Sequence, residues 1–204
     1  MNTLFDLYLA SQSPRRRELL TQVGISFDVL DVDIDETEKD NESAEDYVIR
    51  LAREKAITGW NVEKSKIKPV LGSDTAVVIN GVILGKPDND ADAVRMLGLL
   101  SGKTHQVMTA VALVKSVTSD TQLDQYELSS TISVSDVTFK VLSDREIEQY
   151  VKSGECHDKA GSYAIQGLAA AFITHLSGSY SGVMGLPLFE TVELLNKAGI
   201  STDS

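Results

Sequence analysis

Short apolar runs alternate along the chain with amphipathic stretches of helical spacing, and this alternation limits the possible folds more than any other feature. The alternation follows no strict strand–helix–strand rhythm, and Asn80-Gly81 between two apolar runs is a typical two-residue hairpin turn. Hairpins pair their strands antiparallel, whereas strand–helix–strand units pair them in parallel. The sequence therefore predicts an α/β fold built on a mixed sheet.

Cap and turn residues set the expected boundaries of the elements. Ser43 predicts one helix start, and the capping box Ser143–Glu146 predicts another. Asp88 or Asp90 is expected to cap a further helix. We expect helices at residues 15–23, 43–59, 88–100, 143–152 and 187–199. We expect strands at residues 4–10, 25–32, 70–71, 76–79, 82–84, 106–115, 128–142 and 170–176, and a hairpin loop at 116–122.

Length and composition bound the function as well as the fold. With 204 residues, 42% hydrophobic and 24% charged, the chain matches a soluble globular protein, and we expect one domain over residues 1–204. A net charge of −11 argues against general binding of nucleic acid through its phosphates. The apolar runs fall far short of the roughly 20 residues that cross a bilayer, so no membrane association is expected. The single cysteine and the lack of an export signal indicate the cytoplasm.

The first candidate site is Ser13-Pro14-Arg15-Arg16, directly after the first apolar run. Ser13 can cap the following helix, Pro14 fits its first turn, and the N–H groups of a helix start attract anions. Arg15 and Arg16 would complete a phosphate cradle. A well-capped surface helix with solvated arginines is the alternative interpretation, but open α/β sheets bind ligands where strands end.

The second candidate site, Gly72-Ser73-Asp74-Thr75, places a carboxylate between two strand-like runs. Burial there is unfavourable unless the charge is paired or binds a metal. A catalytic Asp74 and a turn aspartate bonded to its own backbone are both compatible with this fragment. The acidic segment 31–46 holds nine carboxylates against one lysine, and its Asp35 and Glu36 are candidate metal ligands in an otherwise solvated loop.

Three further side chains can contact a nucleotide. Lys55 lies on a predicted helix and Lys86 in a Gly-Lys-Pro turn, and each can bind a phosphate or simply face water. Gln166 follows a stretch of small residues in 158–167 that lets backbone approach a ligand closely. Its amide can read a pyrimidine edge or bond to backbone.

Several motifs occur together in one order, which is more specific than any one of them. They are Leu9-Ala10-Ser11-Gln12-Ser13-Pro14-Arg15-Arg16, Gly72-Ser73-Asp74-Thr75, Leu84-Gly85-Lys86-Pro87, Leu100-Ser101-Gly102-Lys103-Thr104-His105, Asp158-Lys159-Ala160-Gly161 and Gly185-Leu186-Pro187. With these motifs the chain closely resembles the Maf family of nucleotide pyrophosphatases over nearly its whole length. The resemblance implies an α/β fold with an elongated mixed sheet flanked by helices, two lobes and a central nucleotide cleft.

The resemblance also implies an activity, which is hydrolysis of nucleoside triphosphates to the monophosphate and pyrophosphate, with dTTP, UTP and modified pyrimidine triphosphates as candidate substrates. A divalent cation, Mg²⁺ or Mn²⁺, held by Asp74 with Glu36 and Asp35 would assist water attack at the α-phosphorus, with Asp74 as general base. Arg16, Thr75 and Gln166 would tune the choice of base, and a homodimer is expected. The implied substrate-binding residues are Ser13, Arg15, Arg16, Lys55, Thr75, Lys86 and Gln166.

Other functions remain open at this stage. The nearest is a 7-methyl-GTP pyrophosphatase of the same family. A second is a nucleotide-binding regulator of septum formation without significant turnover. A third is a partner-binding module whose surface is the acidic segment 31–46, which would show no stabilisation by nucleotide.

Overall fold

A computed structural model of the chain describes residues 5–63, 65, 67–117 and 125–201. Its strands are β1 (Leu7–Leu9), β2 (Phe27–Val29), β3 (Val70–Ile79), β4 (Val82–Leu84), β5 (Thr104–Ser116), β6 (Tyr126–Phe139) and β7 (Ile173–Ser177). Its helices are α1 (Pro14–Gln22), α2 (Ala44–Val62), α3 (Asp90–Leu100), α4 (Asp144–Lys152), α5 (Tyr180–Met184) and α6 (Leu188–Lys197), with 3₁₀ turns η1 (Ala160–Ser162) and η2 (Leu168–Phe172).

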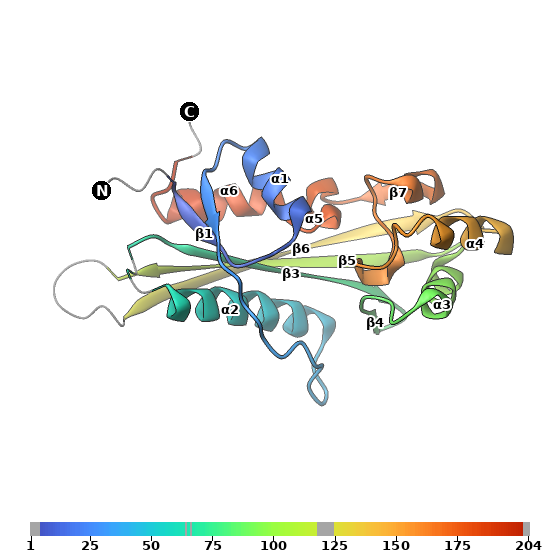
Figure 1. Ribbon diagram of the computed structural model, residues 1–204, viewed down its shortest axis with the longest axis horizontal. Coiled ribbons are helices and arrows are strands. Elements are labelled where there is room, and N and C mark those ends of the chain that lie inside the picture. Colours follow the sequence, from blue (N-terminus) through green and yellow to red (C-terminus); the bar gives the residue numbers. More distant parts are fainter. Residues whose placement is uncertain (1–4, 64, 66, 118–124, 202–204) are drawn as a thin grey trace. The chain divides into compact units, whose positions relative to one another are not determined.

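The strands form one seven-stranded sheet in the order β2-β1-β3-β5-β6-β7, with β4 paired to β3 (Figure 1). β1 pairs in parallel with both β2 and β3. The β3–β4 and β6–β7 pairs are antiparallel. The predicted α/β fold with a mixed sheet flanked by helices is confirmed. Among the described residues, no helix combines the length and apolar character needed to cross a membrane.

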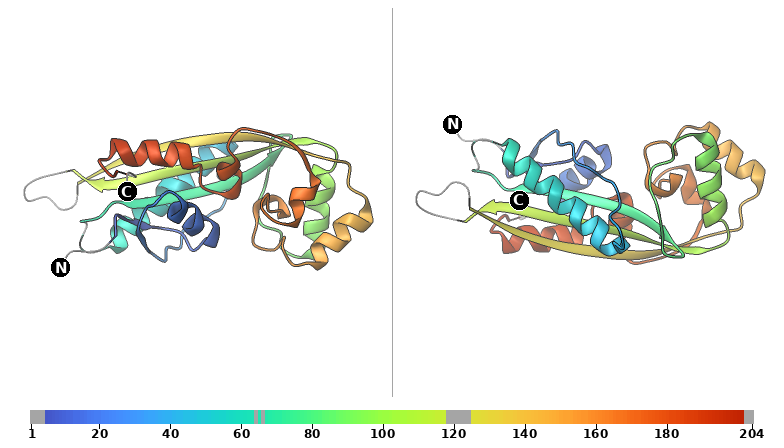
Figure 2. Two further views of the ribbon diagram at one scale, coloured as in Figure 1. Left: turned by 90° about the horizontal axis from the view of Figure 1, so that it is seen from above. Right: turned by 90° about the horizontal axis from the view of Figure 1, so that it is seen from below.

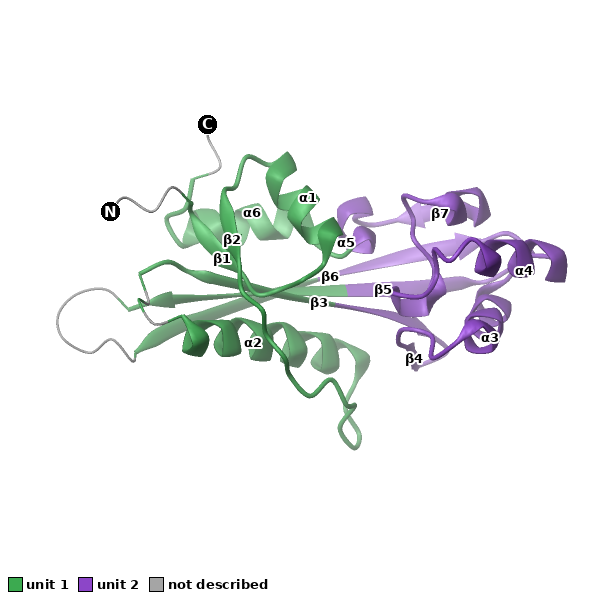
Figure 3. Cartoon of the chain, viewed as in Figure 1, with its two compact units in different colours: residues 1–74, 109–132, 185–204 green, residues 75–108, 133–184 purple. Residues whose placement is uncertain are grey.

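The chain divides into two compact units (Figure 3). Unit 1 contains residues 1–74, 109–132 and 185–204, and unit 2 contains residues 75–108 and 133–184. In unit 1, α2 covers one face of the strands, and α1 and α6 cover the other (Figure 2). Its largest fully buried side chain is Trp60 of α2.

A close approach between α2 and β3 shapes unit 1. A Cβ atom on Gly72 would lie 2.3 Å from the carbonyl oxygen of Ala52 and 2.6 Å from the backbone nitrogen of Ala56. No side chain fits in such a gap, so glycine allows β3 to pack directly against the backbone of α2. This contact brings the centre of β3 within reach of side chains on the helix.

Unit 2 has its own hydrophobic core beneath α3 and α4. The aromatic rings of Phe139 and Tyr163 pack edge to face with their centres 4.9 Å apart. His105 is buried beside them, and its Nε2 lies 2.8 Å from the hydroxyl of Tyr163. The surrounding buried side chains include Val77, Leu97, Val137, Tyr150 and Phe172.

The predicted helix boundaries agree with the structure to within a few residues, whereas several strand boundaries are wrong. β1 and β2 are each only three residues long inside the predicted runs 4–10 and 25–32, and β6 (Tyr126–Phe139) is shifted from the predicted 128–142. Ser43 caps α2, and Ser143 with Glu146 forms a complete capping box on α4. The cap of α3 is Asn89, whose side chain accepts the N–H of Asp92, so neither Asp88 nor Asp90 caps that helix. The final strand is shorter than predicted because residues 168–172 form a 3₁₀ turn. Residues 118–122 of the predicted hairpin loop lie outside the described residues.

Candidate active site

Asp74 lies inside a continuous strand. Residues 70–79 form one strand, β3, where the sequence predicted two separate runs, so the alternative of a turn aspartate is wrong. Side chains alternate along a strand, so Gly72 and Asp74 share one face of β3 and Ser73 points to the other. Because the Gly72 face packs on α2, Asp74 is directed toward the helix. The residue is only 7% exposed.

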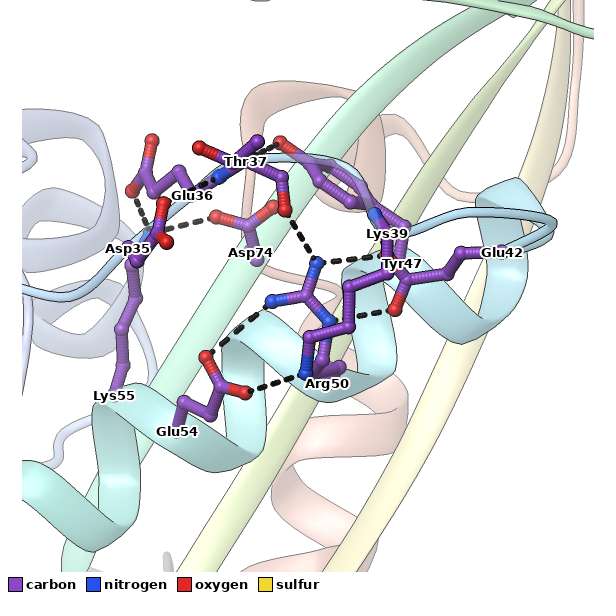
Figure 4. A network of polar contacts seen from close by, with 10 residues as sticks. All are labelled: Asp35, Glu36, Thr37, Lys39, Glu42, Tyr47, Arg50, Glu54, Lys55 and Asp74. Carbon is purple, nitrogen blue, oxygen red and sulfur yellow. Dashed lines mark hydrogen bonds and ion pairs between the residues drawn. The ribbon is translucent and has the colours of Figure 1, made fainter.

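Lys55 of α2 joins Asp74 to the acidic loop (Figure 4). Its Nζ lies 2.7 Å from Oδ1 of Asp74 and 2.7 Å from Oε1 of Glu36. The side chains of Lys55 and Asp74 are 13% and 10% exposed, whereas that of Glu36 is 47% exposed. An unpaired buried carboxylate is costly, and the ammonium group offsets that cost here. Lys55 is therefore paired and mostly buried, so the alternative of a solvated lysine is wrong, and its part in binding phosphate stays a prediction.

Arg16 is held by backbone from a distant part of the chain. Its Nε donates to the carbonyl oxygen of Gly185 over 2.8 Å, and its Nη1 donates to Oγ of Ser11 over 3.0 Å. The hydroxyl of Ser73 donates to the same Gly185 carbonyl over 3.2 Å. Burial lowers the pKa of the Arg16 guanidinium, and the nearby Asp74 carboxylate opposes that shift. Arg16 is thus a fixed, buried cation and not a solvated surface arginine.

The start of α1 differs in one respect from the prediction. Ser13 occupies the N-cap position with Pro14 in the first turn, but its side chain makes no capping hydrogen bond. Instead, the backbone N–H of Ser13 donates to Oγ of Ser11 over 3.3 Å. Ser11 therefore organises this turn, since it also accepts from Arg16. Arg15 is half-buried beside it.

The remaining predicted site residues belong to unit 2. Thr75 directly follows Asp74 and is half-buried, whereas Lys86 and Gln166 are exposed in turns. The N–H of Gly161 donates to the carbonyl of Gly85 over 3.0 Å, which joins the turn of Lys86 to the segment that precedes Gln166. The part of these side chains in binding substrate stays a prediction.

Asp74 and Glu36 fit a divalent cation as oxygen ligands. Oδ1 of Asp74 and Oε1 of Glu36 each lie 2.7 Å from the Nζ of Lys55. The distance between these two oxygens is therefore at most the sum of the two contact distances. Mg²⁺ holds oxygen ligands at about 2.0–2.1 Å, and in nucleotide enzymes it takes one or two carboxylates together with water and phosphate oxygens. The described residues gather no group of three or more Asp, Glu, His or Cys side chains suited to a metal.

Asp35, the third predicted metal ligand, is engaged within the loop. Its Oδ1 accepts the backbone N–H of Thr37 over 2.9 Å, and hydrogen bonding to Thr37 lowers the pKa of Asp35. The structure thus brings Lys55 into direct contact with both Glu36 and Asp74. The role of Asp35 as a ligand stays a prediction.

Sequence reasoning missed three partners in this site. The family motifs contain Ser11, Ser73 and Gly185, but the sequence did not predict the hydrogen bonds that these residues form. Arg16 donates to Ser11 and to the Gly185 carbonyl, and Ser73 donates to the same carbonyl. A signal was present, because a small polar residue beside a candidate catalytic acid in a buried strand needs a hydrogen-bond partner.

Comparisons with known proteins agree on one family. The family model described as "Maf-like protein" matches residues 6–198. The chain is 51% identical over 197 residues to the dTTP/UTP pyrophosphatase of Pseudoalteromonas atlantica, covering 96% of this chain and 98% of that one. It is 53% identical over 190 residues to the protein of the same name from Photobacterium profundum, covering 91% and 92%. The corresponding Escherichia coli O157:H7 protein is 50% identical over 190 residues, covering 93% and 91%.

Proposed function

The chain belongs to the Maf-like protein family, and from that premise we propose that it hydrolyses dTTP and UTP to the monophosphate and pyrophosphate. The observation that carries the proposal is the buried Asp74 in contact with Lys55, in a chain that matches relatives named dTTP/UTP pyrophosphatase over almost its full length. The proposal includes a single domain, a cytoplasmic location and a homodimer.

Asp74 is the proposed general base. It takes a proton from a water molecule whose oxygen forms a bond to the α-phosphorus, while the bond between that phosphorus and the bridging oxygen breaks. Pyrophosphate leaves with the electron pair. The pairing with Lys55 supports this role because the ammonium group holds the Asp74 carboxylate in a fixed position inside β3.

Positive side chains supply the electrostatic part of the reaction. Phosphoryl transfer depends mainly on positioning and on neutralising the charge that develops on the leaving group. Arg16 suits this task because its guanidinium is already fixed by Gly185 and Ser11 before substrate arrives. The other proposed phosphate ligands are Ser13, Arg15, Lys55 and Lys86.

Asp74 and Glu36, with Asp35, are the proposed ligands of a divalent cation, Mg²⁺ or Mn²⁺. When bound, such a cation polarises phosphate oxygens as a Lewis acid. Thr75, Gln166 and Arg16 are the proposed determinants of base choice.

A direct assay tests the proposed function. Purified protein is incubated with dTTP, UTP, CTP, GTP, ATP and 7-methyl-GTP plus Mg²⁺, and pyrophosphate and monophosphate are quantified separately. Selective release of both products from dTTP and UTP is expected. Preference for 7-methyl-GTP would contradict the substrate assignment but keep the reaction, and binding without turnover would favour a nucleotide-dependent regulator.

A further inference from the structure

A network of polar side chains on α2 holds the loop that carries Glu36 (Figure 4). The hydroxyl of Tyr47 donates to the carbonyl oxygen of Glu36 over 3.0 Å. The Nη2 of Arg50 donates to the carbonyl oxygen of Thr37, also over 3.0 Å. Residues three apart in a helix lie on the same face, so one face of α2 binds two consecutive carbonyls of the loop.

Arg50 is itself fixed by the far end of the same loop. Its Nε lies 2.5 Å from Oε1 of Glu42 and its Nη2 lies 2.7 Å from Oε2, which is a two-pronged ion pair. The two side chains are 13% and 9% exposed. Hydrogen bonding from Arg50 lowers the pKa of Glu42 to about 2, so this carboxylate stays ionised at neutral pH. The guanidinium also lies 5.5 Å from the centre of the Tyr47 ring.

These contacts act on Glu36 through its backbone. The carbonyl that Tyr47 binds belongs to the peptide unit directly after the Glu36 Cα atom, so the bond restricts the direction in which the side chain leaves the backbone. The restricted direction is the one that brings Oε1 within 2.7 Å of Lys55. An unrestrained acidic loop would populate many other directions, because fixing each residue costs conformational entropy.

We infer that Tyr47 and Arg50 are positioning residues that hold Glu36 against the Lys55–Asp74 pair. Both side chains bind backbone carbonyls of the loop, and we assign their effect on Glu36 to these bonds. The inference rests on the proposed function, because the position of Glu36 affects turnover only if this pair is catalytic. It also predicts that the network affects turnover only while the Glu36 carboxylate is present.

Two conservative variants test the inference. Tyr47→Phe removes one hydroxyl and keeps the ring, whereas Arg50→Lys keeps the charge and loses the two-pronged contact with Glu42. For Tyr47→Phe, kcat/KM for dTTP is expected to fall about three- to tenfold, the effect of one lost hydrogen bond. Arg50→Lys disturbs the bonds to both Glu42 and Thr37, so its loss is expected to be at least as large. In a Glu36→Gln background, each substitution is expected to cost less than about twofold, because coupled residues are not additive.

Proteolysis gives a second measurement that does not depend on turnover. The side chain of Lys39 in the loop is 63% exposed, and trypsin cleaves after lysine once the backbone is released. Without nucleotide, cleavage at Lys39 is expected to be faster in both variants than in the wild type. Tyr126→Phe and Arg95→Lys are matched controls elsewhere on the surface, and both are expected to leave cleavage and turnover unchanged.

The outcomes separate the inference from the proposed function. Equal losses of kcat/KM with and without Glu36→Gln would overturn the inference, as would unchanged cleavage at Lys39. If the wild-type protein leaves dTTP and UTP intact, the proposed function fails, and the cleavage rates still decide whether Tyr47 and Arg50 hold the loop.

Discussion

The Nζ of Lys55 lies 2.7 Å from Oδ1 of Asp74, which joins α2 to β3 within unit 1. The contact depends on Gly72, because only a residue without a side chain lets the strand come this close to the helix backbone. The ion pair between Asp74 and Lys55 therefore depends on Gly72. Changes at each of them have separable consequences.

Replacing Asp74 with Asn removes the proposed base and keeps the size of the side chain. We expect kcat to fall at least about 100-fold, the lower range for loss of a general base, while the protein stays folded. Pyrophosphate release from dTTP and the circular dichroism spectrum measure the two effects. Asp136→Asn, at an exposed position on β6, is the control. Near-normal turnover of Asp74→Asn would remove Asp74 from this role.

Replacing Lys55 with Met leaves Asp74 buried without its cation. We expect the free energy of unfolding to fall by about 2 kcal/mol, because breaking one side of a mostly buried ion pair strands the other charge. Turnover should also fall. Urea unfolding of Lys55→Met, Asp74→Asn and the double variant measures the coupling, and the double variant is expected to lose less than the sum of the two. Strict additivity would argue against the pairing.

Replacing Gly72 with Ala tests the close approach of β3 to α2. The new Cβ would lie 2.3 Å from a backbone oxygen, so one element must shift, and we expect a loss of about 3 kcal/mol or more. Gly98→Ala in α3 is the matched control, because nothing lies within 4 Å of its Cβ position. There alanine should stabilise the helix by up to about 1 kcal/mol. Similar effects at both positions in thermal unfolding would contradict the packing described.

The burial of His105 leads us to expect that the stability of the protein depends on pH. Burial lowers its pKa from 6.5 to about 4, so between these values the unfolded chain takes up a proton that the folded protein does not. The folded protein is therefore most stable, with respect to this group, above pH 6.5, and it loses this contribution to the free energy of unfolding as the pH falls toward 4. We expect the wild type to lose up to about 3 kcal/mol more than His105→Gln over this window. Urea unfolding at both ends of the window measures it, with His175→Gln, exposed on β7, as control. Parallel losses in wild type and His105→Gln would refute this origin.

The sequence alone predicted those contacts that join residues a few positions apart in the chain. The side chain of Ser43 accepts the N–H of Asp46, and Ser143 and Glu146 cap α4 reciprocally. Asn80 and Gly81 adopt the positive φ values that their hairpin turn requires. Each of these arrangements is set by local sterics and hydrogen bonding, which a sequence pattern reports directly.

Contacts between distant segments could not be predicted in the same way. Arg16 and Gly185 are 169 positions apart, and no local pattern tells which carbonyl a buried guanidinium will meet. The continuous strand through Asp74 was also missed, because its Gly-Ser-Asp-Thr segment has the composition of a turn and only packing against α2 makes it a strand. The family resemblance named the residues, but the structure was needed to show which of them touch.

The bond from Arg16 to Gly185 also bears on protein synthesis. Translation proceeds from the N-terminus, so Arg16 is synthesised long before Gly185. Its hydrogen bond to the Gly185 carbonyl can form only after residue 185 has been synthesised. Unit 1, which contains both residues, is completed last, whereas every residue of unit 2 has by then been synthesised. A nascent chain therefore lacks the carbonyl that fixes the Arg16 guanidinium until residue 185 has been synthesised.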